Sequence, residues 1–246
     1  MSRMTRDQER WNTPWTRGDM IAVAAEAPVA TRVAFIRRTY LHVAGAVLAF
    51  TAITAGLMQL PMIDDIVRMM SSRGAWLVLM LAFTGVAYGA DRLARSEASS
   101  GLQYLGLALY VLLEAAIFTP MIYFASRFGP PNVLLTAAGA TGALFLGLTA
   151  TVFLTKADFS FLRIVLLLGA VAATVAVVAS LLLGFSLGVW FTVAMIFLAS
   201  AYIAYDTSNI LHHYRTDQHV AASLALFASV MLLFWYVLRL FMQRRD

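Results

Sequence analysis

The chain has 246 residues, of which 61% are hydrophobic and only 13% are charged. A soluble domain carries about 25% charged residues, so this composition excludes an ordinary soluble protein and indicates a membrane protein. The absence of cysteine excludes disulfides, thiolate catalysis and cysteine-based metal sites. In a membrane protein, the net charge of +5 reflects topology and contact with the lipid bilayer, so we expect no nucleic-acid partner.

The N-terminal segment is rich in arginine. Residues 1–38 contain seven arginines against four acidic residues, and they lack the continuous apolar stretch of a signal peptide. Because Lys and Arg are retained on the cytoplasmic side of a membrane, we predict that residues 1–38 form a cytoplasmic tail.

The remainder, residues 39–243, is predicted to be an all-α transmembrane domain. A spanning helix needs roughly 20 mostly apolar residues. Seven stretches qualify: Thr39–Leu60, Gly74–Ala90, Leu102–Ser126, Val133–Thr155, Ile164–Leu183, Leu187–Tyr205 and Val220–Leu240. The second is short and the connection after the fifth is very tight, so six spans plus one half-inserted segment is the alternative.

The distribution of Lys and Arg predicts the orientation. With the N-terminus inside, the inner segments carry twelve of these residues and the outer segments six. Three arginines follow the last span, at 239, 244 and 245, and with seven spans they would lie on the outside. They leave the side of the C-terminus open.

Small residues predict where the spans touch, because they allow helix backbones to approach closely in lipid. Gly85 and Gly89 form a GxxxG pattern in the second span, and Ala138 and Gly142 lie four residues apart in the fourth. In the last span, small residues at 221 and 225 lead to Ser229, about halfway along the helix.

Few ionisable residues fall within the apolar stretches. They are His42, which has the simpler interpretation of an interfacial histidine, Glu114 in the third span, and Asp206 at the end of the sixth. If the sixth helix runs on to about residue 214, Asp206 and Ser229 lie roughly 12 Å and 16 Å from the following turn. Counted in the same way from the start of its own span at Leu102, Glu114 lies at a depth of roughly 18 Å. Polar groups at similar depth predict a wetted cavity or ion site inside the bundle.

A histidine-rich stretch follows the sixth span. His212, His213 and His219 surround Asp217 there. Histidines titrate between pH 5 and 8, so these could sense acidification or bind a metal, but their spacing matches no specific metal motif. A solvated polar loop is the simpler interpretation.

Several of these segments resemble the Bax inhibitor-1 family. The resemblance rests on Tyr205–Ile210, on the returning helix through Leu224–Phe227, on Lys156–Leu162 after the fourth span, and on Glu114–Ala116 followed by Pro120. It covers about residues 32–243, with the motifs in the family's order.

The resemblance implies seven transmembrane helices with the last one central, and a pH-sensitive calcium leak. It also implies a pair of aspartates on the sixth and seventh helices whose protonation governs opening. Asp206 matches the first, whereas Ser229 occupies the place of the second. We therefore hypothesise that Glu114 supplies the second carboxylate, so that Asp206 and Glu114 bind the passing calcium ion, with Arg92 as a cationic partner. We expect no tightly bound cofactor.

Two other classes of function compete with a leak channel. Some bacterial members of the family resemble modulators of a membrane-anchored AAA protease that clears misfolded membrane proteins, and a chain with Ser229 fits that description. An intramembrane aspartyl protease would need a second aspartate in a Gly-x-Gly-Asp motif, which the sequence lacks, so we predict that the chain is not an enzyme. We expect a bacterial cytoplasmic (inner) membrane location.

Overall fold

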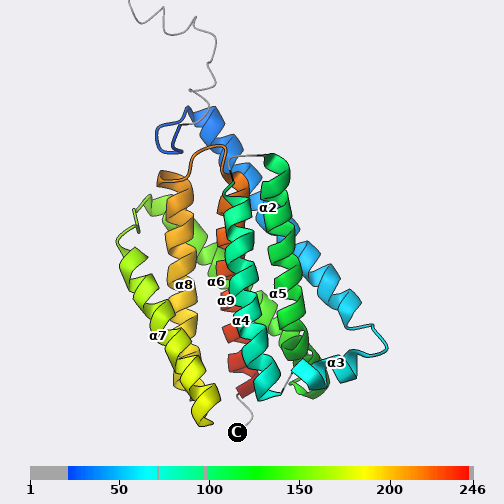
Figure 1. The fold of residues 1–246 in the computed structure, drawn as a ribbon. Helices are drawn as coiled ribbons and strands as arrows, with labels where there is room; N and C mark the ends of the chain where they lie inside the picture. Colours follow the sequence, from blue (N-terminus) through cyan, green and yellow to red (C-terminus); the bar gives the residue numbers. More distant parts are fainter. Residues whose placement is uncertain (1–21, 71, 97–98, 244–246) are drawn as a thin grey trace, which may run out of the picture.

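The computed structural model describes residues 22–70, 72–96 and 99–243, except for the side chains of residues 73, 76 and 77. Within these ranges the chain forms helices and no strand, which confirms the all-α class (Figure 1). The helices are α2 (Val29–Leu57), α3 (Ile63–Met70), α4 (Arg73–Ala94), α5 (Ser100–Phe128), α6 (Val133–Thr155), α7 (Leu162–Leu183), α8 (Gly188–His212) and α9 (His219–Gln243).

Six of the described helices are long and apolar enough to cross a membrane, namely α2 and α5 to α9. The chain is therefore a multi-pass membrane protein. The predicted second span corresponds to α4, which is not among those six, and α3 is a short connecting helix of eight residues. The seven-span count stays a prediction.

The first helix begins earlier than expected. α2 starts at Val29, directly after Pro28, whereas the sequence pattern placed the start of the span at Thr39. Phe35 explains the difference, because its side chain is 2% exposed and packs into the core, so the helix continues through the arginines. Residues 29–38 are thus helical, and residues 1–21 of the predicted tail lie outside the described residues.

The segment that precedes α2 packs against the turn between α8 and α9. The backbone N–H of Ala24 donates to the carbonyl of Tyr214 at 2.9 Å, and the N–H of Thr216 donates to the carbonyl of Ala22 at 3.2 Å. Part of the predicted tail is therefore held at this end of the bundle.

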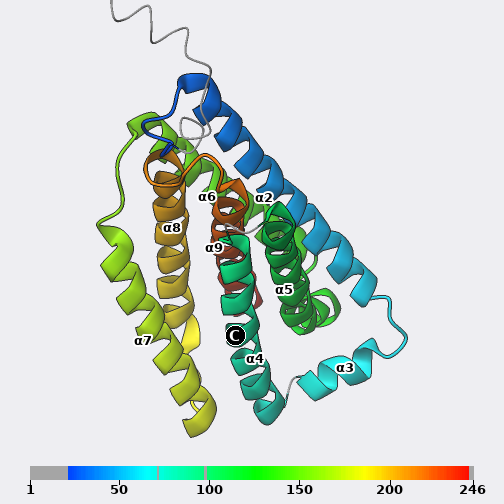
Figure 2. The same ribbon diagram turned by 45° about the horizontal axis from the view of Figure 1, so that its top comes forward.

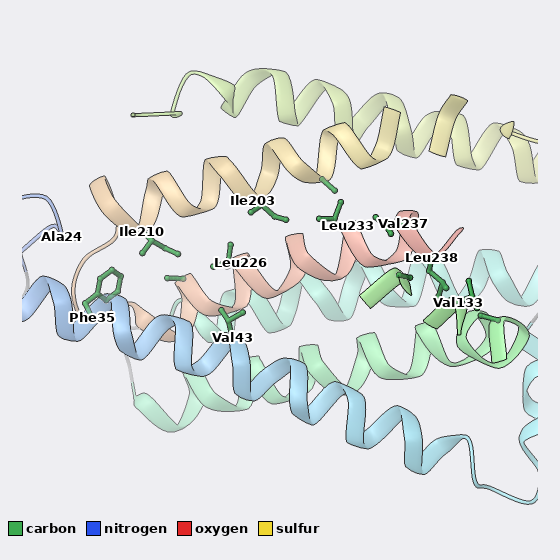
Figure 3. Close-up of a cluster of buried hydrophobic side chains, with 14 residues drawn as sticks. Ala24, Phe35, Val43, Val133, Ile203, Ile210, Leu226, Leu233, Val237 and Leu238 are labelled. Carbon is green, nitrogen blue, oxygen red and sulfur yellow. The ribbon is translucent and has the colours of Figure 1, made fainter. Parts of the chain in front are cut away.

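The last helix occupies the centre of the bundle, as the family resemblance implied. α9 contacts α2, α4, α5, α6 and α8 (Figures 1 and 2). In the most apolar 18-residue stretch of α9, 67% of the residues are buried inside the protein, whereas the share is 6% in the corresponding stretch of the peripheral α7. Figure 3 shows Leu226 and Leu233 of α9 in the cluster that also contains Ile203 of α8. Lipid gives helices no hydrophobic drive to associate, so this packing and the polar contacts described below must hold α9 in place.

A close contact between α4 and α5 involves a glycine that the sequence patterns did not single out. A Cβ atom on Gly106 of α5 would lie 2.5 Å from the carbonyl oxygen of Ala90 in α4. By contrast, a Cβ atom on Gly85 or Gly89 would meet nothing within 4 Å in the described part of the chain. The GxxxG pattern therefore does not mark this helix contact.

Candidate functional site

Asp206 and Ser229 form a buried pair between α8 and α9. Their side chains are 7% and 5% exposed. The Ser229 hydroxyl donates a hydrogen bond of 2.5 Å to the Oδ2 atom of Asp206. The structure thus brings together the two residues that the depth argument placed at similar distances from the turn. A hydrogen bond from a neutral donor to a carboxylate is among the stronger side-chain contacts in a protein.

A buried tyrosine of α2 interacts electrostatically with Asp206. The hydroxyl of this residue, Tyr40, faces the hydroxyls of Thr149 in α6 and Thr207 in α8. None of the three finds a hydrogen-bond partner of good geometry among the described residues. Three such hydroxyls close together are an unusual feature of a packed bundle, because most buried polar groups are hydrogen-bonded. We call Tyr40, Thr149 and Thr207 the Tyr40 cluster.

A charged group acts on Asp206 from the region where α8 turns into α9. Arg95, directly after α4, forms an ion pair of 2.8 Å with Asp91 and also acts electrostatically on Asp206. Arg95 lies against Tyr214 in the turn. Burial raises the pKa of Tyr214 to about 12, and the neighbouring Arg95 partly opposes this shift. The Tyr214 phenol therefore stays protonated over the whole physiological pH range.

Arg92, the predicted cationic partner, lies elsewhere. Its side chain is exposed, with the guanidinium carbon 5.7 Å from the ring centroid of Tyr88, one turn back on the same helix. The cation that acts on Asp206 is instead Arg95. Three residues turn a helix by about 300°, so a charge placed near a helix end by sequence alone has an uncertain direction.

Glu114 is buried, at 5% exposed, but in a different part of the bundle. Its hydrogen-bonding partner is Tyr110, one turn earlier on α5. Within the described residues, neither Glu114 nor Asp206 is among the groups that act on the other. The reason is topological, because α9 packs against both α5 and α8 and separates them. The structure does not bring the two predicted calcium ligands together, and the described residues contain no cluster of three metal-ligating side chains.

The segment after α6 is fixed to α8 by a residue that the sequence analysis did not single out. The backbone N–H of Phe159 donates to the Ser208 hydroxyl at 2.9 Å, and that hydroxyl lies 3.3 Å from the carbonyl oxygen of Ala157. Ser208 is fully buried. The two family-like segments, Lys156–Leu162 and Tyr205–Ile210, therefore bind each other directly.

A second contact of this segment lies at the surface. The Asp158 carboxylate is 3.3 Å from Nε2 of His213, and both side chains are about half exposed. The backbone N–H of Ser160 lowers the pKa of the Asp158 carboxyl, and His213 lowers it further, against a weaker opposing effect of burial. An exposed pair of this kind contributes little stability. Its histidine belongs to the predicted solvated loop.

Comparison with known proteins gives the family. A family profile described as "Inhibitor of apoptosis-promoting Bax1" matches residues 32–246. The chain belongs to the Bax inhibitor-1 family. One relative, an uncharacterized membrane protein of Vibrio cholerae, is 30% identical over 162 residues, which cover 64% of this chain and 70% of the relative. Another, named "Modulator of FtsH protease YccA" from Escherichia coli K12, is 28% identical over 200 residues, covering 81% of this chain and 85% of the relative.

Ser208 provides a test of how the two family segments are held together. Replacing Ser208 with alanine removes the acceptor of the Phe159 N–H and leaves that partly buried donor without this partner. We expect the free energy of unfolding in detergent micelles to fall by about 0.5–1.5 kcal/mol. The control is Ser180→Ala in α7, because that hydroxyl only returns to the carbonyl of Val177 in its own helix. Equal effects of the two substitutions would contradict this role of Ser208.

Proposed function

We propose that this protein is a non-conducting modulator of a membrane-anchored AAA protease of the FtsH type, with a role in the quality control of membrane proteins. The observation that carries the proposal is the Asp206–Ser229 pair, in which a hydroxyl stands where the family resemblance implies a second carboxylate.

The chemistry of this pair favours a fixed link over an ion gate. Two carboxylates held close together share a proton, so one of them titrates near neutral pH and can act as a switch. The hydroxyl of Ser229 donates to Asp206 but does not titrate in that range. Calcium also prefers several oxygen ligands that include carboxylates, and the second buried carboxylate, Glu114, lies apart from Asp206.

The relatives support the same choice. The Escherichia coli relative that aligns with 81% of this chain is named as a modulator of the FtsH protease. We extend that role to this chain, together with an inner-membrane location and a cytoplasmic N-terminus, which the excess of Lys and Arg in the inner segments favours. In this arrangement α4 also crosses the membrane, which brings the number of spans to seven, and Arg95 and Tyr214 lie near the cytoplasmic side.

The modulator function is tested by reconstituting the purified protein with FtsH in liposomes that also contain a membrane-protein substrate of the protease. We expect the initial rate of substrate degradation to fall as the amount of the protein increases, because a bound partner restricts access of substrates to the membrane part of the protease. Liposomes with an equal amount of an unrelated multi-pass protein are the control. An unchanged rate at saturating amounts would contradict the proposal.

A calcium leak is the second candidate, and the Tyr40 cluster is the observation that favours it. Its three buried hydroxyls make no hydrogen bond of good geometry among the described residues, and Tyr40 interacts electrostatically with the buried Asp206, as polar groups would along a hydrated ion path. The Arg95 side chain at the end of this cluster would then act as the gate.

Calcium flux into proteoliposomes at pH 6 and pH 8 separates the two candidates. We expect no pH-dependent flux from the wild type, and a flux that differs between the two pH values from Ser229→Asp, since two neighbouring carboxylates share a proton near neutral pH. A pH-dependent leak from the wild type that Asp206→Asn removes would instead establish the leak function.

A further inference from the structure

Two histidines and a tyrosine from three different helices meet at the start of α9. Nε2 of His42 in α2 lies 3.1 Å from the hydroxyl oxygen of Tyr104 in α5, and that oxygen lies 3.3 Å from Nε2 of His219 in α9. The two imidazole rings also contact each other, with 5.1 Å between their centroids. One phenol oxygen thus bridges two histidines, and we call these three residues the His42 cluster.

The hydrogen bonds determine where the protons of the cluster lie. Nδ1 of His42 is 2.6 Å from the backbone carbonyl oxygen of Arg38, which can only accept, so Nδ1 carries a proton. In the neutral ring, Nε2 of His42 therefore accepts the proton of the Tyr104 hydroxyl. Because that hydroxyl has a single proton, Nε2 of His219 has to donate to the phenol oxygen. With both rings neutral, each of these contacts has one donor and one acceptor.

The second ring nitrogen of His219 provides an independent observation. This Nδ1 atom is buried and has no hydrogen-bond partner among the described residues. In the neutral ring described above it is a bare nitrogen. Protonation of the ring would turn it into a buried N–H group on a charged ring with no acceptor within the described structure, which is costly.

The charges around the cluster also oppose protonation of both rings. Two positive charges would then lie on rings in direct contact, and the Arg38 guanidinium of α2 acts on His219 as a third. The acidic group that acts on His219 is Asp217 in the turn before α9, and its carboxylate already pairs with Arg215 at 2.8 Å. From α5 the rings face the phenol of Tyr104. Like charges therefore gather where three helices meet.

We propose that the His42 cluster is a proton-sensitive contact, which joins α2 to α5 and α9 while its rings are neutral and weakens when both rings are protonated. Histidine is the side chain whose ordinary titration range lies between pH 5 and 8, so the contact responds to acidification at this end of the bundle. Tyr104 is 43% exposed, which gives protons access. The cluster is distinct from the Asp206–Ser229 pair, and this inference does not depend on the modulator function.

The test measures the melting temperature of the full-length protein in detergent micelles at pH 8 and at pH 5.5. We expect the wild type to melt at a lower temperature at pH 5.5. We expect His42→Gln and His219→Gln each to remove a large part of this fall, because glutamine keeps a hydrogen-bonding amide but does not titrate. A purely structural role of either histidine would lower the melting temperature equally at both pH values.

The matched control is His213→Gln in the turn after α8. The protonated ring of His213 pairs with the Asp158 carboxylate at 3.3 Å, so its replacement should leave the fall on acidification unchanged or make it larger. A fall of the same size in the wild type, His42→Gln and His219→Gln would overturn the proposal. A wild type whose melting temperature does not fall on acidification would also overturn it.

A further variant, Tyr104→Phe, separates the hydrogen bonds from the charges. It removes the bridging hydroxyl at a partly exposed position and leaves both imidazoles in place. We expect a lower melting temperature at pH 8 and a fall on acidification at least as large as that of the wild type. Loss of the fall in Tyr104→Phe would contradict the repulsion between the two protonated rings and overturn the proposal.

Discussion

A carboxylate buried between helices in a membrane has to find its partners inside the protein, because the hydrocarbon core supplies no water. Asp206 finds its partner in Ser229, and this hydrogen bond joins α8 to the central helix. Since α9 also packs against α2, α4, α5 and α6, a contact that fixes α8 on α9 fixes α8 relative to the rest of the bundle. The position of a single polar pair thereby constrains the arrangement of most of the helices.

The same constraint links the buried pair to an apolar cavity between α2 and α6. Tyr40 belongs to both regions, since its hydroxyl faces Thr207 and Thr149 and interacts electrostatically with Asp206, while the residue also lines the cavity. The surroundings of the buried carboxylate and the lining of this cavity therefore share one residue.

Sequence patterns predicted the features that depend on apolarity along one helix. The all-α class, most of the spans and the depths of Asp206 and Ser229 follow from such patterns, and the family resemblance added the central position of the last helix. The patterns did not predict which side chains meet across helices. Residue counts predicted a similar depth for Glu114 and Asp206, yet α9 separates their helices. Arg95 rather than Arg92 acts on Asp206, because a difference of three residues near a helix end changes the direction of a side chain.

The most direct test of this account is a double-mutant cycle on Asp206→Ala and Ser229→Ala, with the free energy of unfolding measured in detergent micelles. If the pair joins α8 to α9, the effects of the two substitutions are not additive, and the coupling energy is about 0.5–3 kcal/mol in favour of the pair. Additive effects, within about 0.3–0.5 kcal/mol, would show that the hydrogen bond does not stabilise the bundle and would contradict the account.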